Sequence, residues 1–326
     1  MPEEAMQRGD SPPVGRRVVV TGGDSELGLV VTETFVRAGC EVTAIVGNRR
    51  RADRVRQAGG HPVVADTERA RGLVDVFRGA DAVLHLSQQV TNTLLHDGRA
   101  WRGWARRLPR ETSAVVEAAQ AAGVRYLVAG SYAALYGESR DATEATPIAP
   151  PNDRVFDAAA TAERIVERGG VPSCRVRFGF LYGPQSKDLS RYVTSFKLFR
   201  PYYAGPEHTL GNWLHFEDAA EALLRIVESW PAPPVLNVVD GHPVNFGTVI
   251  DRFAALLGFP RPGHLPPALR LLFRHFIWHP QQVLLATTTT VRNDLARACL
   301  GWSPRFPTYE DGLQQTIAVW RERGRP

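Results

Sequence analysis

The chain has 326 residues, of which 44% are hydrophobic and 22% charged, and its formal net charge is +5 at pH 7. This composition is typical of a globular protein with a sizeable core and excludes a low-complexity or disordered chain. The arginines are scattered, which argues against a nucleic-acid partner. Cys40, Cys174 and Cys299 lie far apart, so we expect neither disulfides nor a metal site. No apolar stretch reaches the roughly 18 residues of a membrane helix, and we expect a cytoplasmic protein without a membrane partner.

The N-terminal half alternates between strand and helix patterns. Residues 1–15 are acidic and contain prolines, so we expect a disordered tail. Apolar, β-branched runs predict strands at 16–23, 41–47, 61–66, 81–87, 125–131 and 173–179. Helical spacing of apolar residues predicts helices at 26–40, 112–124 and 156–170. This alternation indicates helices on both faces of one sheet, so the predicted fold class is α/β, a Rossmann-type doubly wound parallel sheet.

The pattern changes after residue 184. Residues 185–211 mix aromatics with arginine, and they are followed by strand and helix patterns at 212–216, 217–230, 234–241 and 246–260. Residues 265–286 form an amphipathic segment of the kind found in a core or a dimer face, so we expect a monomer or a homodimer. We predict a Rossmann domain over 16–184 and 212–243, and a smaller, discontinuous substrate-capping region over 185–211 and 244–326.

A glycine-rich stretch, TGGDSELG (Thr21 to Gly28), lies between the first strand and the first helix. In this context glycines allow a tight turn and close approach of a pyrophosphate to a helix N-terminus. Gly22 and Gly28 occupy the outer positions of the pattern, and Ser25 fills the middle one. We predict a dinucleotide site to which Gly22, Ser25, Glu26 and Leu27 contribute.

The end of the second strand indicates which dinucleotide is bound. NAD sites usually have an acid there, but the sequence IVGNRRRADR has no carboxylate before Asp53. Asn48, Arg49, Arg50 and Arg51 are instead suited to the 2′-phosphate of NADP through charge-assisted hydrogen bonds. We therefore expect NADP(H) as cofactor; the alternative is a solvated basic start of a helix.

Several further stretches have a familiar pattern, namely VVAD, DAVLHLS, SYAALYG, RFGFLYGP, LHFEDAAEALL and the C-terminal LGWSPRFPTYEDGLQQTIAVWRE. Together with the glycine-rich loop, they resemble the extended short-chain dehydrogenase/reductases, a family that includes sugar epimerases and dehydratases. The resemblance covers nearly the whole chain. It implies that Asp66 and Thr67 contact the adenosine half of the cofactor, and that Leu86, Ser87 and the Phe178 backbone lie on the nicotinamide side.

The resemblance also reveals which residues are missing. The family's catalytic serine aligns with Tyr132, and Ser131 precedes it. The family's tyrosine, lysine and asparagine fall, in that order, at Val155 or Arg154, at Ala159 or Ala158, and near Leu108. No tyrosine lies between Tyr136 and Tyr182, and the first lysine is Lys187. The usual proton donor and the lysine that lowers its pKa are therefore absent.

Two routes can still supply a proton. Ser131, Tyr132 or Ser87 are the candidate catalytic residues. Alternatively, the substrate is a polycyclic aromatic polyketide whose phenol lies beside the ketone, so that hydride addition leaves a phenolate. The second route resembles that of the atypical ketoreductases of angucyclinone antibiotic biosynthesis. Aromatic residues suited to a large flat substrate are Tyr202, Tyr203, Trp213, Phe273, Phe276 and Trp278, which can equally be core residues.

The predicted function is an NADPH-dependent ketoreductase. The alternatives are a catalytically inactive dinucleotide-sensing regulator or scaffold of the same fold, and a non-redox cyclase or dehydratase that uses the same pocket. Tyr136, Tyr182 and His215 are interpreted as structural residues.

Overall fold

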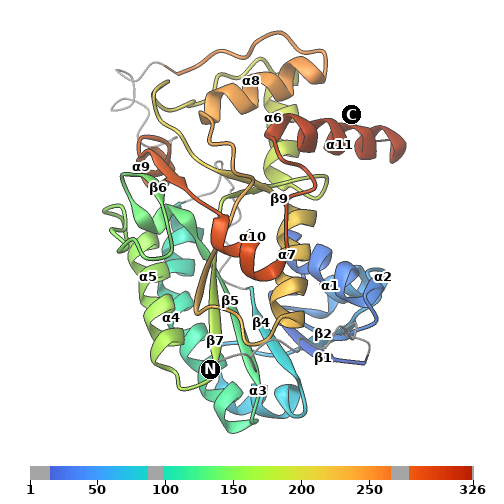
Figure 1. Cartoon of the computed structure of the whole chain (residues 1–326). Coiled ribbons are helices and arrows are strands. Elements are labelled where there is room, and N and C mark those ends of the chain that lie inside the picture. Colours follow the sequence, from blue (N-terminus) through green and yellow to red (C-terminus); the bar gives the residue numbers. More distant parts are fainter. Residues whose placement is uncertain (1–14, 87–97, 266–278, 325–326) are drawn as a thin grey trace.

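The computed structural model describes residues 15–86, 98–265 and 279–324. Its centre is a parallel sheet of seven strands in the order β10-β7-β5-β4-β1-β2-β3 (Figure 1). The strands are β1 (Arg17–Thr21), β2 (Glu41–Val46), β3 (His61–Val64), β4 (Ala82–His85), β5 (Tyr126–Tyr132), β7 (Ser173–Phe178) and β10 (Val235–Val238). This confirms the predicted doubly wound α/β fold. The strand order reverses between β1 and β4, where such sheets bind ligands at their carboxyl ends.

Helices cover both faces of the sheet, as the continuous apolar strands require (Figure 1). One face carries α1 (Glu26–Arg37) and α7 (Phe216–Glu228), which pack against each other. The other carries α3 (Ala70–Phe77), α4 (Gly98–Ala121) and α5 (Arg154–Arg168). A short helix, α2 (Ala52–Gln57), follows β2. Each face therefore has its own hydrophobic core.

The helix expected at 112–124 is longer than predicted. The α4 helix begins at Gly98 and continues through Pro109. Proline normally marks a helix boundary because it lacks an N–H group. The predicted helix is therefore confirmed, but it begins earlier than expected because the buried face of α4 extends on both sides of the proline, through Leu108 and Val115, and packs against α3 and α5.

The expected strand at 212–216 also differs from the prediction. It is β9 (Trp213–His215), and it pairs with β8 (Phe180–Tyr182) in a separate two-stranded sheet instead of joining the central one. A second small sheet joins β6 (Ser139–Ala142) to β11 (Thr289–Val291). The second of these sheets joins the predicted capping ranges to the predicted Rossmann ranges, and both small sheets lie above the carboxyl ends of the central strands (Figure 1).

A further hydrophobic core lies in the predicted capping ranges and includes Tyr182 and Trp213 from the predicted Rossmann ranges. The helices α6 (Lys187–Lys197), α8 (Phe246–Leu256) and α11 (Tyr309–Glu322) share an aromatic cluster, whereas α9 (His279–Leu285) and α10 (Asp294–Leu300) flank β11. Three of the aromatic residues interpreted from the sequence as either substrate contacts or core residues, Tyr202, Tyr203 and Trp213, are buried in this cluster. The other three, Phe273, Phe276 and Trp278, lie outside the described residues, as does the N-terminal tail up to residue 14. Among the described helices, none has the length and apolarity to cross a bilayer.

A fully buried histidine connects β4 to its neighbours. His85 Nδ1 lies 2.8 Å from Thr21 Oγ1, and His85 Nε2 lies 3.1 Å from Thr112 Oγ1. Because the Thr112 hydroxyl donates to the Leu108 carbonyl, His85 Nε2 must donate to Thr112. The neutral ring therefore satisfies both contacts, and burial lowers the pKa of His85 to about 4.

We expect this histidine to destabilise the fold in acid. Between pH 6.5 and about 4 the unfolded chain binds a proton at this position that the folded chain does not. The free energy of unfolding therefore falls by up to about 1.4 kcal/mol for each pH unit lost in that window. Replacing His85 with glutamine should make the free energy of unfolding, measured by urea denaturation, depend less steeply on pH between about pH 7 and 5. The difference should correspond to about one bound proton. An unchanged slope would show that His85 is not the group responsible.

Candidate active site

The glycine-rich loop has the geometry of a pyrophosphate site. Gly22 has φ +67°, which disfavours other residues, and a Cβ on Gly28 would lie 2.2 Å from the Gly22 carbonyl oxygen. Ser25 caps α1, and its Oγ accepts a hydrogen bond from Gly28 N at 2.9 Å, which leaves the hydroxyl hydrogen able to donate. The first N–H groups of α1 have no partner within the helix. These residues therefore fit the phosphates of a dinucleotide.

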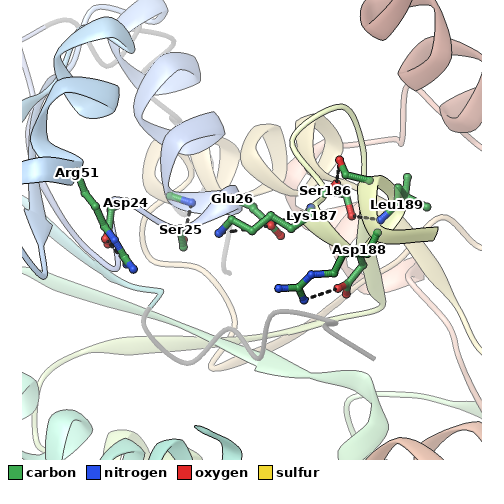
Figure 2. Close-up of polar contacts among 11 residues, drawn as sticks. Asp24, Ser25, Glu26, Arg51, Ser186, Lys187, Asp188 and Leu189 are labelled. Atoms are coloured by element: carbon green, nitrogen blue, oxygen red, sulfur yellow. Dashed lines mark hydrogen bonds and ion pairs between the residues drawn. The ribbon is translucent and has the colours of Figure 1, made fainter. Parts of the chain in front are cut away.

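Leu27 and Glu26, which are also predicted to contact the cofactor, differ in the surroundings of their side chains. Leu27 is fully buried in the core, so only its backbone faces the loop. The Glu26 carboxylate accepts a hydrogen bond from Lys187 N at 3.0 Å and lies 3.7 Å from Lys187 Nζ (Figure 2). Burial raises the pKa of Glu26, and burial together with Glu26 raises the pKa of the neighbouring Asp188 to about 8. The start of α1 is thus tied to α6 of the capping region.

The other predicted adenosine contacts are on the surface. Asn48 precedes a short 3₁₀ turn, Arg49–Arg51, that lies beside the glycine-rich loop. Asp66 follows β3; it accepts a hydrogen bond from Glu68 N at 3.0 Å and pairs with Arg69 at 3.2 Å. The Thr67 side chain is hydrogen-bonded to Glu111 and lowers its pKa, against the larger rise caused by burial.

The carboxyl ends of β5 and β7, where the resemblance predicts the nicotinamide, border an apolar pocket. Tyr132 and Phe178 are register partners on these strands, and both line the pocket. The pocket has an empty volume of about 1000 Å³, part of which is open to solvent. Its aromatic wall consists of Phe156, Phe178, Phe180 and Phe246, and its polar lining residues are Tyr132, Thr209, Asn212, Gln281, Thr287 and Thr289. No charged residue is among the described lining residues. Leu86 is fully buried just after β4, and Ser87 lies outside the described residues.

The structure resolves the alignment at the start of α5. Val155 is 5% exposed and lines the pocket, whereas Arg154 points to solvent. Val155 therefore occupies the position of the family's tyrosine, and Ala159, fully buried four residues on, that of its lysine. An aliphatic side chain and a methyl group replace the proton donor and its cationic partner.

Ser131 does not reach the pocket. Its hydroxyl donates to Glu163 Oε1 at 2.5 Å, and Glu163 forms a bidentate ion pair with Arg177 at 2.9 and 2.6 Å. Arg177 also lies over the ring of Tyr136, 4.7 Å from its centroid. All four residues are buried. Of the two neighbouring candidates, Ser131 and Tyr132, the structure thus brings only Tyr132 to the pocket.

The Glu163–Arg177 pair was missed by the sequence reasoning. A signal was present, because Glu163 falls on the apolar face of a helix and Arg177 within a buried strand. The remaining residues interpreted as structural lie away from the pocket lining. Tyr182 packs against His215, which caps α7 by accepting from Glu217 N at 3.3 Å. Within the part of the chain that the structure describes, no three acidic, histidine or cysteine side chains are grouped to hold a metal.

Comparison with known proteins identifies the family. Residues 18–238 match the model of the NAD dependent epimerase/dehydratase family. The chain belongs to the extended short-chain dehydrogenase/reductases. The resemblance seen in the sequence motifs is therefore confirmed, and the chain is an oxidoreductase-type member of this family.

Two relatives illustrate the range of this family. A 3-diazoavenalumate denitrifying reductase from a Streptomyces species is 31% identical over 312 residues, which cover 91% of this chain and 99% of the relative. The solved structure of DesIV, a dTDP-glucose 4,6-dehydratase from Streptomyces venezuelae with NAD and TYD bound, has a TM-score of 0.77 at 19% identity. That match covers 94% of this chain and 98% of DesIV, and it supports the fold alone.

Proposed function

We propose that this protein is an NADPH-dependent reductase of a polycyclic aromatic ketone that carries a phenol beside its carbonyl group, as aromatic polyketides of antibiotic biosynthesis do. The observation that supports this proposal is the uncharged aromatic pocket beside Phe178, in which Val155 replaces the family's proton donor. A nucleotide sugar has charged phosphates, and the described pocket lining offers no cation to neutralise them. A flat, uncharged aromatic substrate matches the lining better.

The side chains around the pocket can orient such a substrate. Phe156, Phe178 and Phe180 come from α5, β7 and β8, and aromatic rings stack on such walls in offset or edge-on geometry. NADPH bound at the glycine-rich loop supplies a hydride to the carbonyl carbon. Correct placement of two reactants can be worth on the order of 10⁵ M in effective concentration. The pocket thus retains the larger part of catalysis even without an acid.

The proton then has to come from the substrate or from Tyr132. Val155 has no acidic proton, and the Ser131 hydroxyl already donates its hydrogen bond to Glu163. In a ketone with a neighbouring phenol, the phenolic proton is hydrogen-bonded to the carbonyl oxygen. Hydride addition moves that proton onto the new hydroxyl and leaves a delocalised phenolate, which water reprotonates. This route requires no residue that the chain lacks.

Deuterium transfer tests the proposal. The protein is incubated with NADPH deuterated at C4, in separate 4R and 4S forms, and with a polycyclic ketone bearing a phenol next to the carbonyl. We expect deuterium on the carbinol carbon from one of the two forms. The matching ketone with a methylated phenol should react at least about 100-fold more slowly, the scale of a lost general acid. Absence of deuterium from every product would contradict reductase function and favour the regulator or scaffold alternative.

Replacing Tyr132 by phenylalanine separates the two proton sources. If the substrate supplies the proton, the rate of deuterium transfer should stay within about threefold of the wild-type rate, whereas loss of a true general acid typically costs about 10²–10⁴-fold. Single-turnover kinetics with the phenolic ketone measure this directly. A loss of the larger size would assign the acid role to Tyr132.

A second acceptor is favoured by the 31% identical relative, which is named a 3-diazoavenalumate denitrifying reductase. Hydride addition to the terminal nitrogen of an aryl diazonium group gives an aryldiazene. Loss of N₂ breaks the carbon–nitrogen bond and leaves the added hydrogen on the ring carbon. No external proton is consumed, so Val155 and Ala159 are compatible with this reaction as well. With 3-diazoavenalumate and deuterated NADPH, N₂ release and deuterium on the ring would support this activity.

A further inference from the structure

The three arginines after β2 differ in their contacts. Arg51 Nη1 lies 2.8 Å from Asp24 Oδ2, and Figure 2 shows its side chain turned toward the glycine-rich loop. Arg49 and Arg50 are exposed, and no ion pair joins either of them to another described residue. Among the described residues, the turn therefore has two arginines without an ion pair and one, Arg51, that is paired with Asp24.

Asp24 is well placed to affect the cofactor. It lies within the glycine-rich loop, between Gly23 and Ser25, and only 10% of its side chain is exposed. Gly23 N donates to the Ile45 carbonyl at 3.0 Å, which holds this part of the loop against the end of β2. The end of β2 is where dinucleotide folds bind the adenosine ribose and, in NADP, its 2′-phosphate. A carboxylate at this position repels a phosphate but accepts hydrogen bonds from a ribose hydroxyl.

We propose that Asp24 is a specificity-determining residue that limits the preference for NADPH over NADH. It does so in two ways: it places a negative charge beside the 2′-phosphate position, and it withholds Arg51 from that phosphate. Arg49 and Arg50 then provide the remaining attraction for the 2′-phosphate. This inference rests on the proposed use of NADPH.

A binding experiment on the full chain tests the role of Asp24. Dissociation constants for NADPH and NADH are measured by nicotinamide fluorescence without any substrate. In D24N, we expect NADPH to bind about tenfold more tightly, because one repulsive charge is removed and Arg51 is released, whereas NADH affinity stays within about twofold. The matched control is D53N, which breaks the exposed Asp53–Arg56 pair (2.6 Å) and should change neither constant.

A double-mutant cycle tests the role of Arg51. R51A alone should weaken NADPH binding by less than about threefold, because the wild-type arginine is held by Asp24, whereas adding R51A to D24N should reverse most of the tenfold gain. Competition with 2′-AMP and 5′-AMP on the wild-type protein gives a readout that does not depend on how the variants fold.

The outcomes distinguish this inference from the proposed function. If NADPH binds but D24N changes both constants equally or neither, the role of Asp24 is refuted. The same holds if R51A alone weakens NADPH binding as much as R49A does. If NADPH does not bind to the wild-type protein at all, the proposed use of NADPH fails as well.

Discussion

Replacing Glu163 with glutamine is expected to lower the free energy of unfolding by about 3–5 kcal/mol, because breaking a buried ion pair leaves an uncompensated charge. Glu163 is 3% exposed and accepts hydrogen bonds from Arg177 and from Ser131. Glutamine keeps the shape of the side chain but leaves the buried guanidinium without a counter-ion. The two partners come from α5 and β7, which also contribute Phe156 and Phe178 to the apolar pocket, so the loss should loosen the wall of that pocket as well.

Urea unfolding measures this effect, and a second ion pair between the same two segments provides the control. Glu167 pairs with Arg175 at 2.9 Å, but the Glu167 side chain is 54% exposed. E167Q should therefore cost no more than about 1 kcal/mol. Equal effects of the two substitutions would contradict the view that burial makes the Glu163 pair critical.

Replacing Gly28 with alanine is expected to weaken NADPH binding by at least about 100-fold, since the added methyl group collides with the backbone that must approach the pyrophosphate. A Cβ at this position would lie 2.2 Å from the Gly22 carbonyl oxygen and 2.9 Å from Gly23 Cα. Neither atom can move without changing the turn. Fluorescence titration with NADPH gives the dissociation constant, and circular dichroism confirms that the variant is folded.

The control for this substitution is Gly72 in α3, which is exposed and has no atom within 4 Å of an added Cβ. Because alanine favours helix, G72A should leave NADPH binding unchanged and stabilise the protein by up to about 1 kcal/mol. If G28A bound NADPH as tightly as G72A, the glycine-rich loop would not be the pyrophosphate site.

The missing proton donor changes what the family's scaffold can do. With Val155 and Ala159 at the positions of the family's tyrosine and lysine, the apolar pocket lacks the family's usual proton donor. A phenolic ketone and an aryl diazonium group are chemically different, yet both accept a hydride without needing an acid from the protein. Deuterium on a carbinol carbon or on a ring carbon tells the two reactions apart.

The sequence by itself determined the central sheet and the glycine-rich loop. Strands such as β1 and β4 have apolar, buried centres, and the requirements at Gly22 and Gly28 arise from contacts within eight residues of chain. Such features depend on backbone conformation and local burial, which short patterns express directly. For the same reason the sequence motifs alone indicate the family.

Only the tertiary structure decided how the site is arranged. It showed that Val155, and not Arg154, lines the pocket, and that the Ser131 hydroxyl is turned to Glu163. It placed Tyr202 and Trp213 in the capping core and built the aromatic wall from other residues. The tertiary structure also brings Glu26 into hydrogen-bond contact with Lys187, which is 161 residues away in the sequence. Each of these contacts joins elements distant in sequence, and their partners are set by packing that no local pattern encodes.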